Sequence, residues 1–126
     1  MRLLLDTHAF IWAMGKASRL PSRVAAAIRD PENELWLSAV SLYEIEYKRD
    51  RDTVLGRLPS DLIGAATDLP AQWLVVTPEH AETAARLDRV HKDPWDRLIV
   101  GQAMVEGLVI VSVDPAMKAF GVQTLW

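Results

Sequence analysis

Four carboxylates in this sequence stand where a negative charge needs an explanation. Asp6 ends the apolar run RLLL, and Asp114 ends the run VIVSV. Glu44 and Asp96 lie in segments with helical periodicity. Two carboxylates about 4 Å apart repel each other by roughly 4 kcal/mol at an effective dielectric constant of about 20. If these acids converge, they must therefore share protons or bind cations.

The rest of the composition limits the chemistry of such a cluster. The chain has no cysteine, and its three histidines, His8, His80 and His91, lie too far apart to suggest a site. His8 lies close to the first acid, and we expect it to be a bystander. Oxygen ligands alone favour Mg²⁺ or Mn²⁺ over Zn²⁺. Such an ion would let a chain of net charge −3 attract a phosphodiester and would supply an activated water.

Length and charge set further limits. The 126 residues, half of them apolar, predict one domain over 1–126 with a single core. The net charge of −3 gives no general attraction to nucleic acid or to an anionic membrane. The apolar N-terminus is interrupted before it reaches signal-peptide length, and no later run predicts a membrane span. We therefore expect a soluble protein of the cytoplasm, with which the lack of cysteine is compatible.

Apolar runs alternate with helical segments, which predicts an α/β fold with a mainly parallel sheet. The expected strands are 2–5, 34–40, 73–76, 108–113 and 122–125, the fourth at the middle of the sheet and the last at an edge. The expected helices are 7–15, 21–30, 41–51, 60–66, 78–91, 93–107 and 114–120. Residues 53–71 are the least legible part of the chain outside that short helix.

These elements place the four acids near one another. Asp6 and Asp114 follow strands, and the carboxyl ends of parallel strands share one edge of the sheet. At about 100° per residue, Glu44 lies on an apolar stripe with Tyr43 and Tyr47. Asp96 similarly heads an inward stripe of the following helix. The pattern therefore predicts an acidic site at this edge.

Helix capping is the alternative explanation for each acid. Asp6 and Asp114 suit N-cap positions, and Ser41 with Glu44 fits the S-x-x-E capping box. Asp96 could complement the dipole of a helix from its first turn. Four unrelated caps, however, have no reason to fall on one side of a sheet.

The motifs LLLDTHAFIW, SAVSLYEIEYK, HKDPWDRLIVGQAM and VIVSVDPAM occur in this order. Together they resemble the PIN-domain ribonucleases, and specifically the VapC-type toxins of bacterial toxin–antitoxin pairs. The resemblance covers nearly the whole chain and implies a PIN-like three-layer α/β/α sandwich with a mainly parallel central sheet. It also implies an acidic catalytic and metal site, with supporting hydroxyls, made of Asp6, Glu44, Asp96, Asp114, Thr7 and Ser41.

The resemblance further implies a Mg²⁺- or Mn²⁺-dependent endoribonuclease. Asp6, Asp96 and Asp114 would position the metal. Glu44 would complete the set of acidic ligands and orient the attacking water. Hydrolysis would leave a 5′-phosphate and a 3′-hydroxyl. The implied partners are an RNA substrate, a second copy of the chain in a homodimer, and a small antitoxin whose C-terminal segment crosses an apolar groove to the acidic pocket.

A basic segment follows Glu44, with Lys48, Arg49 and Arg51 as candidate contacts to the RNA backbone. Interspersed aspartates make a solvated face of mixed charge an equal alternative. Arg97 is expected to pair with a neighbouring acid, or else with a phosphate.

Other α/β domains bind Mg²⁺ through an aspartate after the first strand. A receiver domain needs adjacent acids there and a late lysine, whereas Thr7 follows Asp6 and the late position holds Asp114. A phosphatase of the haloacid-dehalogenase type needs a second aspartate where this chain has His8. A PIN fold that only binds its partner is a third alternative, and the presence of all four acids argues against it.

Overall fold

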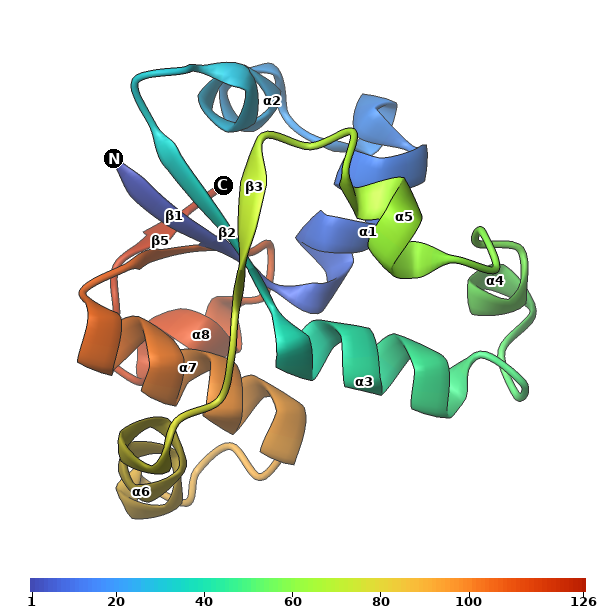
Figure 1. Ribbon diagram of the computed structural model, residues 1–126. Helices are drawn as coiled ribbons and strands as arrows, with labels where there is room; N and C mark the ends of the chain where they lie inside the picture. The colour runs from blue at the N-terminus through green and yellow to red at the C-terminus, as the bar shows by residue number, and fades with distance from the viewer.

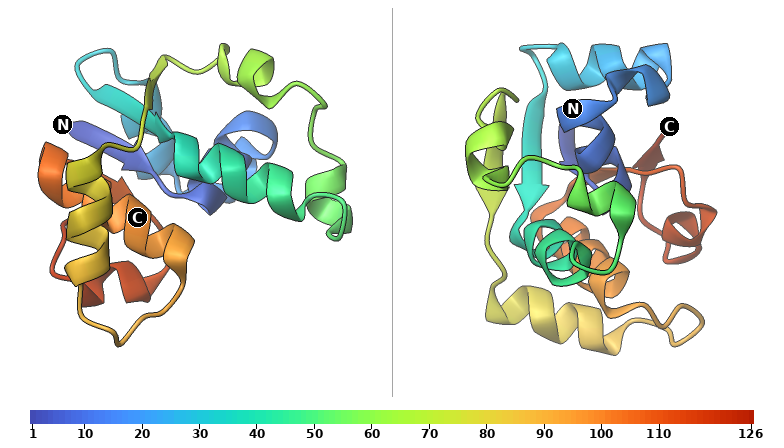
Figure 2. Two further views of the ribbon diagram at one scale, coloured as in Figure 1. Left: turned by 60° about the horizontal axis from the view of Figure 1, so that its bottom comes forward. Right: turned by 90° about the vertical axis from the view of Figure 1, so that its right-hand side faces the viewer.

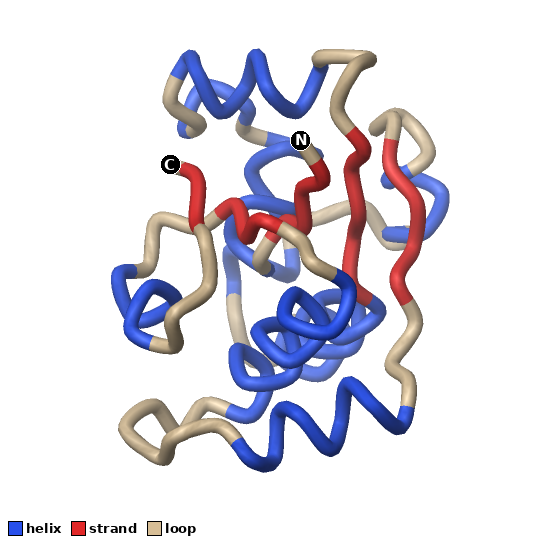
Figure 3. Tube along the Cα trace, turned by 90° about the vertical axis from the view of Figure 1, so that its left-hand side faces the viewer, coloured by secondary structure: helices blue, strands red, loops and turns tan.

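The computed structural model describes residues 1–126 and contains one five-stranded, fully parallel sheet. In the order β3-β2-β1-β4-β5, the strands are Ala71–Leu74, Glu34–Ser38, Arg2–Leu5, Val109–Val111 and Thr124–Leu125. Figure 3 shows β3 and β5 at the two edges of the sheet. The sheet is therefore parallel throughout, and β1 rather than β4 is its central strand.

Helices cover both faces of the sheet (Figure 1). The helices are α1 Thr7–Gly15, α2 Ser22–Arg29, α3 Ala39–Lys48, α4 Thr53–Gly56, α5 Leu62–Ala66, α6 Pro78–Arg86, α7 Pro94–Glu106 and α8 Pro115–Ala119, with a 3-10 turn at Ala17–Arg19. Helices α1, α2 and α5 lie on one side, and α6, α7 and α8 on the other. The expected α/β/α sandwich is confirmed.

The sequence of β1 explains how one strand serves two cores. Leu3, Leu4 and Leu5 are all fully buried. Successive side chains of a strand point to opposite faces, so Leu3 and Leu5 join the core under α1 and α2, and Leu4 joins the core under α7. A strand buried on both faces has no place for a polar residue until it ends, which it does at Asp6.

Several boundaries differ from those expected. Strand β2 ends at Ser38, whose hydroxyl accepts a hydrogen bond from the backbone N–H of Val40 at 3.0 Å and so caps α3. The helix therefore begins two residues before Ser41, and the S-x-x-E capping box is wrong. Strand β3 begins and ends two residues early, because Leu74 pairs with Ser38, the last residue of its neighbour.

Helix α7 is fixed against the sheet by one buried polar side chain. The amide of Gln102 lies 2.5 Å from Oγ of Ser38 and also donates to the carbonyl of Val75 at 3.2 Å. This contact ties α7 to the ends of β2 and β3. Helix α3 also packs against α7 and extends beyond the ends of the strands (Figure 2). None of the helices has the length and apolar character that crossing a membrane requires.

Candidate active site

Asp6 joins the central strand to α1. Asp6 is only 3% exposed, and its Oδ1 accepts a hydrogen bond from the backbone N–H of Ala9 at 2.8 Å. Burial raises the pKa of Asp6, the hydrogen bonds from Ser112 and Ala9 oppose this rise, and the charge of Asp96 adds to it. Asp6 is thus an N-cap, as the alternative explanation predicts, and also a carboxylate within the field of a second acid.

Asp96 lies in the first turn of α7, where Pro94 and the N-cap Asp93 start the helix. Its Oδ2 lies 2.8 Å from Nε2 of His91. Burial raises the pKa of Asp96, the hydrogen bond to His91 lowers it, and the charges of Asp93 and Glu44 raise it further. The Asp96 carboxylate therefore lies within the field of several other acids.

Asp114 reaches the same place from the end of β4. Its Oδ1 accepts a hydrogen bond from the backbone N–H of Ala116 at 2.9 Å and caps α8. One ligand atom each from Asp114, Asp96 and His91 lie within 4.8 Å of one another. The loop before α7, the helix itself and the loop after β4 thus converge.

Glu44 approaches from α3. Its side chain is 13% exposed, and its Oε1 accepts a hydrogen bond from the hydroxyl of Thr7 at 2.7 Å. Oγ of the buried Ser41 lies 3.1 Å from the same hydroxyl. Lys48 holds its ammonium 2.6 Å from Oε2 of Glu44. Thr7 follows Asp6, so this contact joins α3 to the end of the central strand.

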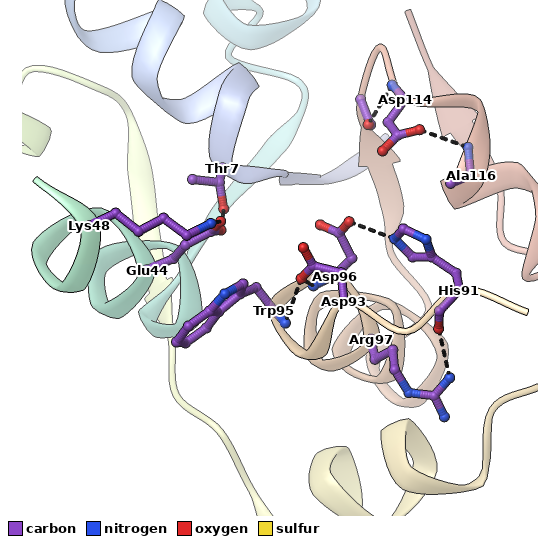
Figure 4. A network of polar contacts seen from close by, with 11 residues as sticks. Thr7, Glu44, Lys48, His91, Asp93, Trp95, Asp96, Arg97, Asp114 and Ala116 are labelled. Carbon is purple, nitrogen blue, oxygen red and sulfur yellow. Dashed lines mark hydrogen bonds and ion pairs between the residues drawn. The ribbon is translucent and has the colours of Figure 1, made fainter. Parts of the chain in front are cut away.

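Figure 4 shows Asp96 between the contact of Glu44 with Thr7 on one side and His91 and Asp114 on the other. Capping accounts for one oxygen of Asp6 and one of Asp114, but it does not account for Glu44 or Asp96. The donors are mainly carboxylate oxygens, which suit a hard divalent cation. A cation would also relieve the repulsion and burial that raise the pKa values of Asp6 and Asp96. The residues therefore fit a Mg²⁺ or Mn²⁺ ion.

The three histidines do not form a site together, but the expectation that none of them suggests a site is wrong for His91, because this residue lies in the acidic cluster. It belongs to the loop between α6 and α7, and its ring contacts Phe120 edge-on with centroids 5.7 Å apart. The sequence signal was its position five residues before Asp96. No helical or strand period positions a loop residue, so that spacing alone could not reveal the contact.

The basic residues have separate roles. Lys48 lies in the site, whereas Arg49 donates to the carbonyls of Leu58 and Pro59 and pairs with Glu46. Arg51 is exposed and lies 4.0 Å from the neighbouring Asp50.

The expected pairing of Arg97 with an acid is wrong, because its guanidinium donates to main-chain carbonyls instead. The acceptors are the carbonyls of Ala84, Ala85, Leu87, Asp88 and His91. These hydrogen bonds satisfy carbonyls at and just after the C-terminal end of α6. The helix ends at Arg86 and does not continue to residue 91 as expected. A guanidinium used in this way is not available to a phosphate.

An exposed aromatic cluster borders the site. Tyr43 and Tyr47, expected on an apolar stripe, are 58% and 57% exposed. Their rings stack with centroids 5.9 Å apart, and each ring lies within 6.0 Å of Trp95. The ammonium of Lys48 lies 5.9 Å from the centre of the Trp95 ring. The stripe that carries Glu44 therefore faces outward at these two tyrosines.

Comparison with known families adds an independent observation. The family model described as PIN domain matches residues 3–122. The chain belongs to the PIN-domain family. The match includes all four acids and all strands of this PIN domain except the edge strand β5 and the first residue of β1. No curated protein matches the sequence.

Solved structures share the fold of this PIN domain. One is VapBC2 from Rickettsia felis bound to a DNA fragment from its promoter, with a TM-score of 0.73 at 14% identity, covering 99% of this chain and 98% of that one. Another is DNA-bound VapBC from Salmonella typhimurium, with a TM-score of 0.74 at 18% identity and coverage of 99% and 97%. A third is VapC20 from Mycobacterium tuberculosis, described as a sarcin–ricin loop cleaving toxin, with a TM-score of 0.63 at 18% identity and 95% of each chain covered.

Proposed function

We propose that this PIN domain is a Mg²⁺- or Mn²⁺-dependent endoribonuclease and the toxin of a bacterial toxin–antitoxin pair. The observation that carries the proposal is the convergence of acids from four separate segments at the carboxyl end of a parallel sheet. Open α/β sheets bind ligands at this end. The similar VapBC structures, and the toxin described as cleaving the sarcin–ricin loop, support the choice of activity and substrate.

Asp6, Asp96 and Asp114 would hold the metal. When bound, the ion would offset phosphate charge and lower the pKa of a water. Glu44 is held by Thr7 at Oε1 and by Lys48 at Oε2, and this fixed carboxylate would orient the attacking water. Lys48 would contact a phosphate oxygen of the RNA, since its side chain is 43% exposed beside the acids. Cleavage would leave a 5′-phosphate and a 3′-hydroxyl.

A cognate antitoxin would regulate the enzyme in the cytoplasm, and the active protein would be a homodimer. We place the antitoxin-binding site in a hollow between α1, α3 and α4. This hollow runs from Thr7 and Glu44 at the acidic site to apolar side chains farther away. These include Ile11, Trp12, Val54 and Leu55. An antitoxin segment with an apolar stretch and a terminal basic residue would fill this hollow and pair with the acids.

The test is cleavage of total RNA by the purified protein with Mg²⁺, with Mn²⁺ and with EDTA, comparing the native chain with Asp6→Asn. We expect cleavage only by the native chain and only with a divalent ion, and products that carry 5′-phosphates. A matched control is Asp68→Asn, which changes an exposed aspartate far from the four acids in sequence. Equal cleavage by native protein and Asp6→Asn would contradict the mechanism, and no cleavage of any RNA would favour a binding module.

A further inference from the structure

We infer that His91 is a direct nitrogen ligand of the divalent ion and that it makes the site prefer Mn²⁺ to Mg²⁺. The inference rests on the proposed function, since it concerns the ion of the same site. It adds a ligand of a different chemical kind to a set of carboxylates.

The spacing of the donor atoms carries the first step. Nε2 of His91 lies 2.8 Å from Oδ2 of Asp96. Neighbouring ligands of an octahedral ion with bonds of about 2.1 Å are about 3 Å apart, so these two atoms already have the separation of adjacent ligands. The ligand atoms of the full set with Asp114 lie within 4.8 Å. Opposite octahedral ligands are about 4.2 Å apart, so a small side-chain movement closes the set.

The surroundings of His91 hold its ring in this position. Phe120 packs edge-on against the ring. The carbonyl of His91 accepts a hydrogen bond from Arg97 at 3.0 Å, and Arg97 also binds four other carbonyls of the same region. Both the backbone and the ring are thus fixed beside Asp96. Little conformational entropy would be lost when the imidazole binds an ion.

Ligand chemistry carries the second step. Mg²⁺ binds oxygen ligands and gives up its waters reluctantly, whereas imidazole is a ligand of transition-metal ions. A set of two or three carboxylates and one imidazole therefore discriminates in favour of Mn²⁺. A histidine that only oriented Asp96 through a hydrogen bond would support both ions alike.

The experiment is calorimetric titration of the full chain with Mn²⁺ and with Mg²⁺, comparing native protein, His91→Ala and His91→Gln. Removal of an outer partner typically costs about 10- to 100-fold in metal affinity, so the ratio of the two affinities decides between the roles. We expect the Mn²⁺ Kd to rise by at least about tenfold in both variants, while the Mg²⁺ Kd rises by less than about threefold. Gln retains a hydrogen-bond donor, and it would rescue affinity only if His91 positions Asp96.

A spectroscopic readout tests the bond itself. In spin-echo modulation spectra of the Mn²⁺-loaded native chain, we expect coupling from a directly bound nitrogen, which disappears in His91→Gln. The matched control is His8→Ala, which removes a histidine that follows Asp6 but lies outside the three-residue set. If the His91 variants lose affinity for Mn²⁺ and for Mg²⁺ by the same factor, so that the ratio of the two Kd values is unchanged, the inference is overturned. If the His91 inference fails but Asp96→Asn abolishes metal binding and RNA cleavage, the proposed function stands without a His91 ligand.

Discussion

Lys48 places its ammonium 2.6 Å from Oε2 of Glu44, at the edge of the acidic site. Burial lowers the pKa of Lys48, but the hydrogen bond and charge of Glu44, with the charges of Asp93 and Asp96, raise it above its ordinary value. The lysine is therefore a fixed cation at the edge of the acid cluster. It neutralises one carboxylate and leaves the others for a divalent ion.

Replacing Lys48 separates metal binding from catalysis. Lys48→Met removes positive charge from the cluster, so we expect tighter Mg²⁺ binding together with slower RNA cleavage. The loss of a charge-assisted contact of about 1.5–3 kcal/mol predicts a fall in kcat/KM of roughly 10- to 100-fold. Arg86→Gln is the control, since Arg86 lies in an exposed ion pair with Glu82. A Lys48→Met enzyme with native kcat/KM would show that the lysine has no role in the reaction.

The raised pKa of Asp6 predicts how stability depends on pH in metal-free protein. The folded-state pKa lies above the ordinary value of 3.8, so the folded state binds the proton more tightly than the unfolded state. This contribution is full below the unfolded pKa and is lost as pH rises through the folded pKa. Native protein should therefore lose Tm relative to Asp6→Asn as the pH rises from the ordinary value of 3.8 toward neutrality in EDTA. A Tm difference that is constant across this range would contradict the assignment.

The contact between α6 and α7 depends on a glycine. A Cβ added at Gly101 would lie 2.7 Å from the carbonyl oxygen of His80 and 3.0 Å from Cβ of Ala84. We expect Gly101→Ala to lower the free energy of unfolding by about 1–3 kcal/mol in urea titrations. Gly15→Ala is the matched control, because nothing lies within 4 Å of its added Cβ. That variant should be neutral or up to about 1 kcal/mol more stable.

Arg97 should prove to be a structural residue. Arg97→Lys keeps the charge but loses the planar fork that reaches five carbonyls. We expect a loss of about 1–3 kcal/mol in the free energy of unfolding, because the part-buried carbonyls of Ala84, Leu87 and His91 lose their donors. Arg86→Lys, at an exposed ion pair with Glu82, should cost less than about 0.5 kcal/mol. Equal effects of the two substitutions would contradict this role.

The sequence was most informative where chain direction alone decides the position of a side chain. A strand that is apolar on both faces must end at its first acid, so Asp6 and Asp114 could be assigned to one edge of a parallel sheet. Proline and glycine likewise identified both ends of α7 at Pro94 and Gly107.

The remaining features depend on tertiary packing. His91 contacts Asp96 across a loop. Arg97 donates to main-chain carbonyls that are free to accept only because α6 ends early. The exposure of Tyr43 and Tyr47 follows from where α3 leaves the sheet, which helical periodicity does not determine. The sequence pattern thus predicts which segments meet, whereas packing determines which loop side chains complete the site.

The most direct test of the account is anomalous diffraction from crystals soaked in Mn²⁺. We predict a peak bounded by carboxylate oxygens of Asp6, Asp96 and Asp114, and loss of that peak in Asp96→Asn crystals. A Mn²⁺ peak away from these side chains, or no peak in crystals of a protein that still cleaves RNA, would contradict the central claim.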